Sequence, residues 1–406
     1  MAIEHPSDIR MIGFYGQSGP STNNSHGAVF AALFIIAGSA PVSFLFSARV
    51  GYLIAGMFVL ALAAAGGVYR SGIFRDWSPA AMATLTLFGA YYLVLVLQFF
   101  VTLERATLPY LFLTPLVFVA FVGVAPPLIE VHREAFTAIV ALIGAVMVAL
   151  GFVFLVLWLL GGESLGMTGR LLFGEFRFRI SSIYNNSNSL GFVAGLATLS
   201  ALYLYLQVGA RRWALVGTLL FVGLLFSNSR MAMLTFLAVG VVFAVLQLNP
   251  DGLGTSTLST GYIATLIGVS VLMSVFFFLV SDFLAHAVVS LQRRLDMWSA
   301  ATASITSSPL IGEGFTGKTS THNSYLSIFV NSGVIGGVCY SLGLVVAGFT
   351  ALRRALSGSL WDHYVLTSLA FVYLTLLTET ATLGGLSIAS LALALFIGLG
   401  ISRPDQ

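Results

Sequence analysis

The sequence has few charged residues: charged side chains make up 8% of its 406 residues, and hydrophobic side chains make up 58%. Roughly a quarter of the residues in an ordinary soluble domain are charged, so this composition excludes a soluble globular protein. The net charge of +3 is too small and too dispersed for a nucleic-acid-binding protein. The single cysteine, Cys339, excludes a disulfide framework and a cysteine-ligated metal site.

The chain consists mainly of long apolar runs. A spanning helix needs about 20 apolar residues, so about twelve of them would use about 240 positions, close to the hydrophobic share of the chain. The pattern therefore predicts an all-α polytopic membrane protein with about twelve transmembrane helices. The predicted spans cover residues 28–47, 51–68, 79–100, 107–125, 137–160, 189–208, 213–226, 231–247, 261–285, 323–350, 363–380 and 384–402.

The arginines of the short connections predict the orientation. If the helices alternate from a cytoplasmic N-terminal tail at residues 1–27, three arginine pairs lie on the cytoplasmic side, as the positive-inside rule requires. These pairs are Arg70 with Arg75, Arg211 with Arg212, and Arg353 with Arg354. Residues 28–402 then form a single transmembrane domain, and the segments 161–188, 227–230 and 286–322 meet on the external face. We expect the external loops 161–188 and 286–322 to form the active site.

These external segments carry basic residues against the positive-inside tendency, which predicts that they bind an anion. The residues are Arg170, Arg177, Arg179, Arg230, Arg293, Arg294 and Lys318. An alternative is that single interfacial arginines such as Arg177 and Arg179 only contact lipid headgroups. Arg230 is harder to explain in that way, because it follows Ser-Asn-Ser between two apolar runs with little loop in which it could be solvated.

These segments and the residues that follow them contain five short motifs. They are Arg179-Ile-Ser-Ser-Ile-Tyr-Asn-Asn186, Ser227-Asn-Ser-Arg230, Arg294-Leu-Asp-Met-Trp298, Pro309-Leu-Ile-Gly312-Glu-Gly314, and His322-Asn323 followed after nine residues by Gly333-Val-Ile-Gly336. In order, spacing and common sidedness, the motifs resemble the O-antigen ligase and polymerase superfamily. The last motif is most similar to that of the lipopolysaccharide O-antigen ligase. By motif the resemblance covers about residues 170–345.

The resemblance implies a GT-C-like glycosyltransferase of the bacterial inner membrane with a large periplasmic loop. It implies transfer of a glycan from undecaprenyl diphosphate to lipid A-core at the periplasmic face, by an inverting reaction without a metal or other cofactor. By motif position, His322 would be the catalytic histidine, and Arg230 and Arg294 would be essential arginines. Arg179 would be a third diphosphate ligand, beside Arg177 and Asn186, and Trp298 and Asn323 would support substrate binding.

The residue types suit this chemistry. A leaving diphosphate gains negative charge that a divalent metal or fixed cations must stabilise, and the sequence has no Asp-x-Asp motif or carboxylate cluster that would hold a metal. Arginine donates two hydrogen bonds to phosphate oxygens and stays charged at any working pH. The acceptor hydroxyl needs a base, and histidine has the ordinary pKa nearest to neutral pH.

The function and several of the motifs have alternative interpretations. A polymerase or a protein O-oligosaccharyltransferase of the same superfamily would use the same chemistry, and a transporter of lipid-linked glycans would use a similar number of helices. Gly312-Glu-Gly-Phe-Thr-Gly317 matches a dinucleotide-binding pattern, but no strand precedes it, so we predict a turn that leads to His322. Gly333, Gly336 and Gly337 are predicted to allow close helix packing. Glu379, between two threonines near an external helix end, is a candidate for lining the polar cavity. The sequence does not identify which acidic residue, if any, orients His322.

Overall fold

The computed structural model describes residues 24–69, 77–161, 170–172, 175–177, 179–247, 283–315 and 321–402. The described chain is helical apart from one antiparallel hairpin, in which strand β1 (Arg170–Leu172) pairs with strand β2 (Glu175–Arg177). The predicted all-α class is therefore confirmed, with this hairpin as the exception.

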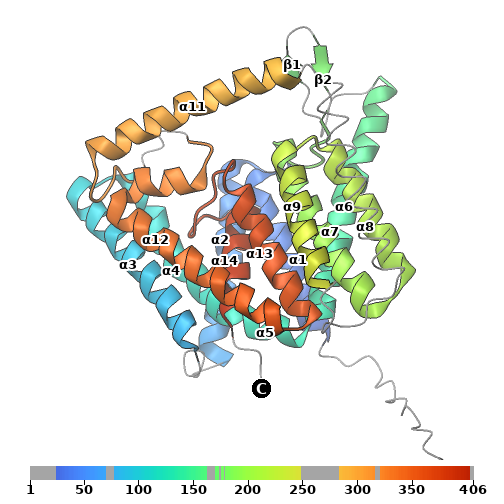
Figure 1. Cartoon of the computed structure of the whole chain (residues 1–406), viewed down its shortest axis with the longest axis horizontal. Coiled ribbons are helices and arrows are strands. Elements are labelled where there is room, and N and C mark those ends of the chain that lie inside the picture. Colours follow the sequence, from blue (N-terminus) through green and yellow to red (C-terminus); the bar gives the residue numbers. More distant parts are fainter. Residues whose placement is uncertain are drawn as a thin grey trace, which may run out of the picture.

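The first half of the chain forms helices that cross the molecule and return (Figure 1). They are α1 (Asn24–Ser39), η1 (Ala40–Val42), α2 (Ala48–Tyr69), α3 (Pro79–Thr102), η2 (Arg105–Thr107), α4 (Leu108–Val117), the π-helical η3 (Phe118–Val124), α5 (Ala125–Val131) and α6 (Arg133–Leu159). The second half contributes α7 (Ser187–Val208), α8 (Arg211–Phe226), α9 (Arg230–Gln247), α11 (Phe283–Ser307), α12 (Ser324–Ser357), α13 (Leu360–Thr375) and α14 (Ile388–Ile401).

Seven described helical stretches are long and apolar enough to cross a membrane, and two shorter apolar helices lie at 26–42 and 388–401. Eleven of the predicted spans fall on described helices, whereas the predicted span at 261–285 lies almost entirely outside the described residues. The chain is therefore a multi-pass membrane protein. The count of about twelve spans remains a prediction, as does the GT-C-like architecture.

Helix α7 packs at the centre of the bundle, because its small residues let neighbouring helices approach closely. A Cβ atom on Gly195 would lie 2.5 Å from the ring of Phe371 on α13, and one on Gly144 of α6 would lie 2.5 Å from the Cβ of Ala197. Helices α6 and α13 therefore pack directly against α7.

Two elements differ from the sequence-based expectation. The segment 286–322 is predicted as a loop, but the structure shows that α11 occupies much of it and lies across one end of the bundle, near β1 and β2 (Figure 1). Gly333 is predicted on a continuous helix, but it breaks α12 with φ 65° and ψ −170°. The break lets residues 309–314 dock against α12, where Val334 N–H donates to Pro309 O at 2.7 Å and Gly314 N–H donates to Asn331 O at 3.0 Å.

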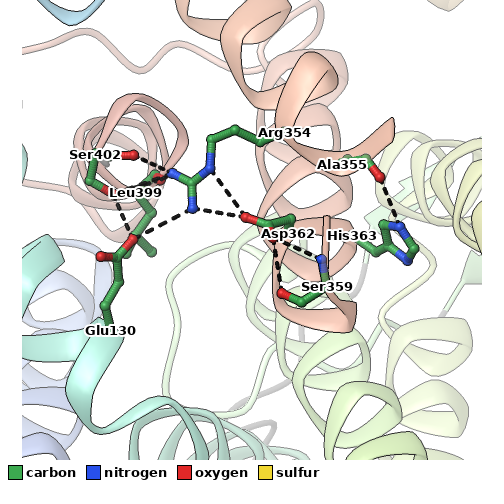
Figure 2. A network of polar contacts seen from close by, with 8 residues as sticks. All are labelled: Glu130, Arg354, Ala355, Ser359, Asp362, His363, Leu399 and Ser402. Carbon is green, nitrogen blue, oxygen red and sulfur yellow. Dashed lines mark hydrogen bonds and ion pairs between the residues drawn. The ribbon is translucent and has the colours of Figure 1, made fainter. Parts of the chain in front are cut away.

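The opposite end of the bundle is held by an ion cluster around Arg354 (Figure 2). Its guanidinium lies 2.8 Å from Asp362 on α13 and 3.6 Å from Glu130 on α5, and it donates to Leu399 O on α14 at 2.7 Å. From the sequence, Arg354 is expected only to mark the cytoplasmic side of the membrane. The structure adds that it joins four helices, because a buried cation needs partners that replace water.

Candidate functional site

The motif segments meet at the end of the bundle where α11 and the β1–β2 hairpin lie (Figure 1). They occupy the residues just before α7 and α12, the turn between α8 and α9, and helix α11 with the segment that follows it. The connection between α13 and α14, which carries Glu379, lies at the same end. Because α7, α9 and α12 all begin at this end, their N-terminal N–H groups favour negative charge there.

Arg179 and Arg230 lie on neighbouring segments. Ile180 N–H donates to Phe226 O at 3.2 Å, which places the residue after Arg179 beside the turn that leads to Arg230. A Cβ atom on Gly191, in the first turns of α7, would lie 2.5 Å from the Cβ of Ser229, so α7 begins against the same turn. Both arginine side chains are half-buried. The structure therefore brings these two predicted phosphate ligands to one region.

His322 is exposed, and its backbone has φ 44°, in the left-handed region. The residues on either side hold it in place: Thr321 Oγ1 donates to Asn323 O at 2.7 Å and accepts from Asn323 N–H at 3.2 Å. Among the described residues, the imidazole has no hydrogen-bond partner. The fold therefore presents His322 from a rigid turn with its ring nitrogens available to a substrate.

Backbone strain gathers at this end. The described non-glycine residues with positive φ are Leu103, Ser182, Asn228 and His322. Three of them belong to the connections around Arg179, Arg230 and α12, and Leu103 follows α3 at the same end. A non-glycine residue in this region costs energy that the surrounding structure must supply, and such residues cluster at functional sites.

Glu379 connects several of these segments. Its Oε1 accepts from Asn188 Nδ2 at 2.6 Å, and its backbone O accepts from Ser324 Oγ at 2.6 Å. Burial raises the pKa of the Glu379 carboxyl, while the bond from Asn188 and the charge of Arg294 on α11 oppose that shift. Through Glu379, α7, α11 and the start of α12, which directly follows His322, are brought into one polar cluster.

For the four remaining predicted residues, the structure shows a helix cap or a position on an element. Asn186 Oδ1 accepts from Asn188 N–H at 3.0 Å and caps α7, and Asn323 Oδ1 accepts from Leu326 N–H at 3.1 Å and caps α12. Trp298 lies one turn after Arg294 on α11, and its indole N–H has no partner among the described residues. Arg177 lies on β2, and its side chain lies outside the described residues. A substrate contact from any of the four remains a prediction.

The sequence predicts Glu379 only as a residue that lines the cavity, and it does not predict a role for Asn188. Glu379 can be identified in the sequence because it lies in a polar Thr-Glu-Thr stretch between two apolar runs. Asn188 follows a capping asparagine by two residues and has no comparable feature. Among the described residues, no group of three or more His, Cys, Asp or Glu side chains could hold a metal ion. Metal independence remains a prediction.

The fold thus defines a multi-pass membrane protein that gathers arginines, an exposed histidine and helix N-termini at one end of its bundle. Comparison with protein families gives the more specific class: residues 215–341 match the model of the O-antigen ligase. This part of the chain is therefore similar to the O-antigen ligase family. The matched region contains Arg230, Arg294 and His322. Comparison with curated proteins gives no significant match.

Proposed function

We propose that this protein is an O-antigen ligase that transfers O-antigen polysaccharide from undecaprenyl diphosphate to lipid A-core during lipopolysaccharide assembly. The observation that carries the proposal is the convergence of the Arg179, Arg230 and Arg294 segments with the turn that presents His322. A membrane-bound diphosphate donor needs cations, and a sugar hydroxyl acceptor needs a base.

In the proposed mechanism, the prenyl tail lies among the helices, and Arg179, Arg230 and Arg294 bind the diphosphate. A neutral imidazole of His322 takes the proton of the acceptor hydroxyl. The hydroxyl oxygen attacks the anomeric carbon from the face opposite the diphosphate, so the configuration inverts. The bond between the anomeric carbon and the phosphate oxygen breaks, and its electron pair stays on the leaving undecaprenyl diphosphate, where the arginine hydrogen bonds stabilise the charge.

The orientation is part of the proposal. We infer an inner-membrane protein with about twelve spans of about 20 residues and a GT-C-like architecture. Its His322 end faces the periplasm. The excess of paired arginines at the Arg211 and Arg353 connections supports this direction, because short cytoplasmic loops retain basic residues. Membrane lipids then surround the bundle, and both substrates reach the site from the outer leaflet.

Two other reactions would use the same site. A polymerase would transfer the glycan to another lipid-linked glycan, and a protein O-oligosaccharyltransferase would transfer it to a hydroxyl of a protein. A transporter of lipid-linked glycans is a separate class. The motif arginines lie at one end of the bundle, which favours chemistry there over passage through the bilayer, because transporters place charged residues near the midplane.

The test is a transfer assay with purified protein, an undecaprenyl-diphosphate-linked glycan carrying a radiolabelled sugar, and a metal chelator. We expect label on lipid A-core when that acceptor is present. When it is absent, we expect the lipid-linked glycan to keep its original length. Growth of the lipid-linked glycan would instead indicate a polymerase, and label on an added protein acceptor an oligosaccharyltransferase. Label that only changes leaflet in proteoliposomes would indicate a transporter. Loss of transfer on chelation, restored by a divalent cation, would contradict the metal-independent mechanism.

A further inference from the structure

A polar cavity lies at the opposite end of the molecule from His322. It has a volume of about 570 Å³, and its lining residues include Arg133, Glu134, Tyr203 and Trp361. They come from the start of α6, the last turns of α7 and the start of α13. Because α6 and α7 are candidate spans that begin and end here, the cavity lies at the depth where a membrane surface meets water.

Two helix N-termini open into this cavity. Its lining includes residues 133–135, the first turn of α6, and residues 360–361, the first turn of α13. The backbone N–H groups of these five residues have no acceptor among the described residues. The N-terminus of each helix carries partial positive charge, so the cavity favours an anion.

Two side chains in the lining point to the same kind of ligand. Trp361 is 2% exposed, and its buried indole N–H has no hydrogen-bond partner among the described residues. The guanidinium of Arg133 lies over the Trp361 ring at 5.3 Å, and its buried Nε–H likewise lacks an acceptor there. Both unpartnered groups are donors. Buried donors are normally satisfied, so a ligand that offers acceptor oxygens fits this cavity.

The acidic residues limit the charge of that ligand. Glu130 is committed to the neighbouring ion cluster, where it accepts from Ser402 Oγ at 2.7 Å and lies 3.6 Å from Arg354 (Figure 2). Glu134 makes no ion pair with a described residue. One cation and two helix N-termini beside one unpaired carboxylate suit a ligand with a phosphate and an ammonium group, because the carboxylate would repel a second negative charge.

We propose that this cavity binds the phosphoethanolamine headgroup of a membrane phospholipid. The phosphate oxygens accept from Arg133, from the indole N–H of Trp361 and from the N-termini of α6 and α13, and the ammonium group pairs with Glu134. The two acyl chains extend along the helices that begin or end at the cavity. The lipid thereby joins α6, α7 and α13 at the end of the bundle remote from His322.

The test is saturable binding to the full-length protein in detergent, measured by native mass spectrometry and by thermal unfolding. The probes are dihexanoyl phosphatidylethanolamine, dihexanoyl phosphatidylglycerol and inorganic phosphate. We expect the first to bind most tightly and to raise the unfolding temperature. Equal binding of phosphatidylglycerol would overturn the assignment of Glu134. Equal binding of inorganic phosphate would identify a soluble phosphate as the source and overturn the lipid, and no saturable binding of any probe would overturn the site.

Variants make this test specific. Arg133→Gln is expected to weaken phosphatidylethanolamine binding by about tenfold or more, because it removes a charged hydrogen-bond donor. The matched control is Arg212→Gln, which removes a guanidinium that lies over the Trp213 ring at 5.5 Å at the same end but outside the cavity lining. Glu134→Gln is expected to remove the preference for phosphatidylethanolamine over phosphatidylglycerol, and this readout remains if Arg133→Gln does not fold. Unchanged binding and unchanged preference in both cavity variants would overturn the proposal.

Discussion

Arginine lies in two different environments at the two ends of this molecule. Arg354 is surrounded by Asp362, Glu130 and backbone carbonyl groups, so its ion pairs and hydrogen bonds hold helices together. Arg294 lies on α11 near Glu379, whose own carboxylate accepts from Asn188. In the first environment, carboxylates and carbonyl groups of the protein itself surround the cation. In the second it is part of a polar cluster beside a presented histidine, which suits a cation that receives the diphosphate of a substrate.

The first prediction at this scale concerns the shape of the arginine side chain. Arg230→Lys and Arg294→Lys retain the positive charge but lose the planar pair of donors. If each arginine donates two hydrogen bonds to the leaving diphosphate, each variant loses about 3 kcal/mol of transition-state stabilisation, or about a hundredfold in kcat/KM. The matched control is Arg211→Lys, an exposed arginine at the other end of the bundle, which is expected to retain wild-type kcat/KM in the same assay. Equal activity of all three variants would contradict the phosphate-binding role.

The second prediction concerns Glu379 and pH. Burial raises the pKa of its carboxyl, so the folded protein retains this proton at pH values where the unfolded chain has lost it. Between the ordinary glutamate pKa and the raised value, the folded state binds more protons, and its stability therefore falls as pH rises. Thermal unfolding in detergent should show this decrease for the wild type and a smaller one for Glu379→Gln, whose amide does not ionise.

The control for this pH series is Glu104→Gln, which changes an acid in the α3–α4 connection outside the polar cluster. It is expected to keep the wild-type dependence of unfolding temperature on pH. If Glu379→Gln also kept that dependence, the carboxyl of Glu379 would not be the group that titrates.

Individual site residues differ in how far the sequence predicts them. His322, Arg230 and Arg294 follow from short motifs, and the matched region contains all three. Asn188 does not follow, because its importance depends on a 2.6 Å contact with a residue 191 positions away. Asn186 and Asn323 show the reverse: their motif positions suggest substrate binding, while the structure shows both side-chain oxygens capping helices. Only the three-dimensional arrangement separates these roles.

At the scale of elements, the break in α12 organises the site. Gly333 adopts φ 65°, and residues 309–314 dock where the helix is interrupted. A Cβ atom on Gly333 would lie 2.4 Å from the carbonyl carbon of Leu310. The docked segment continues to Phe315, whose ring stacks on Tyr110 at 3.6 Å. The connection from α11 to His322 is thereby anchored on its α11 side.

The prediction at this scale is that Gly333→Ala destabilises the protein by about 1–3 kcal/mol, because it combines a left-handed backbone with a backbone clash. Displacement of residues 309–314 should also lower transfer activity. The control is Gly89→Ala on α3, where a Cβ atom would meet nothing within 4 Å. Thermal unfolding and transfer assays on both variants check this. A Gly333→Ala protein as stable and active as Gly89→Ala would show that the break in α12 does not depend on glycine.

Hydropathy predicts most helices of the bundle, because a membrane core requires long apolar helices with internally satisfied backbone groups. It fails for α11, which carries Gln292, Arg294 and Asp296 and therefore does not form a long apolar run. It fails for Gly333 as well, because a glycine among apolar residues is compatible with close helix packing or with a break. The docked segment that decides between them is distant in sequence.

At the scale of the whole molecule, the two ends have different polar features. One end gathers the motif segments, the positive-φ residues and His322. The other contains the Arg354 cluster and the cavity beside Arg133. The bundle separates these features because seven of its described helical stretches are long and apolar enough to cross a membrane. The proposed function requires the first end to face the periplasm.

Cysteine labelling tests this orientation directly. Cys339 is the single cysteine, so Cys339→Ser gives a background without thiols. In that background, Arg105→Cys at the His322 end should react with a membrane-impermeant maleimide once only the outer membrane is permeabilised. Arg212→Cys at the other end should react only after the inner membrane is disrupted. Both positions are exposed in the structure. The reverse pattern would contradict the proposed periplasmic site.

We infer that His322 acts as the base in transfer of a lipid-linked glycan. Its imidazole is exposed and makes no hydrogen bond with a described residue, so His322→Ala should leave the fold intact. The matched control is His26→Ala, which changes another exposed histidine, at the start of α1. The decisive measurement is transfer of labelled glycan from undecaprenyl diphosphate to lipid A-core by the purified wild type and both variants. Thermal unfolding should first show that all three proteins have the same unfolding temperature. We predict transfer by the wild type and His26→Ala and none by His322→Ala, whereas undiminished transfer by His322→Ala would contradict the role of His322 as the base.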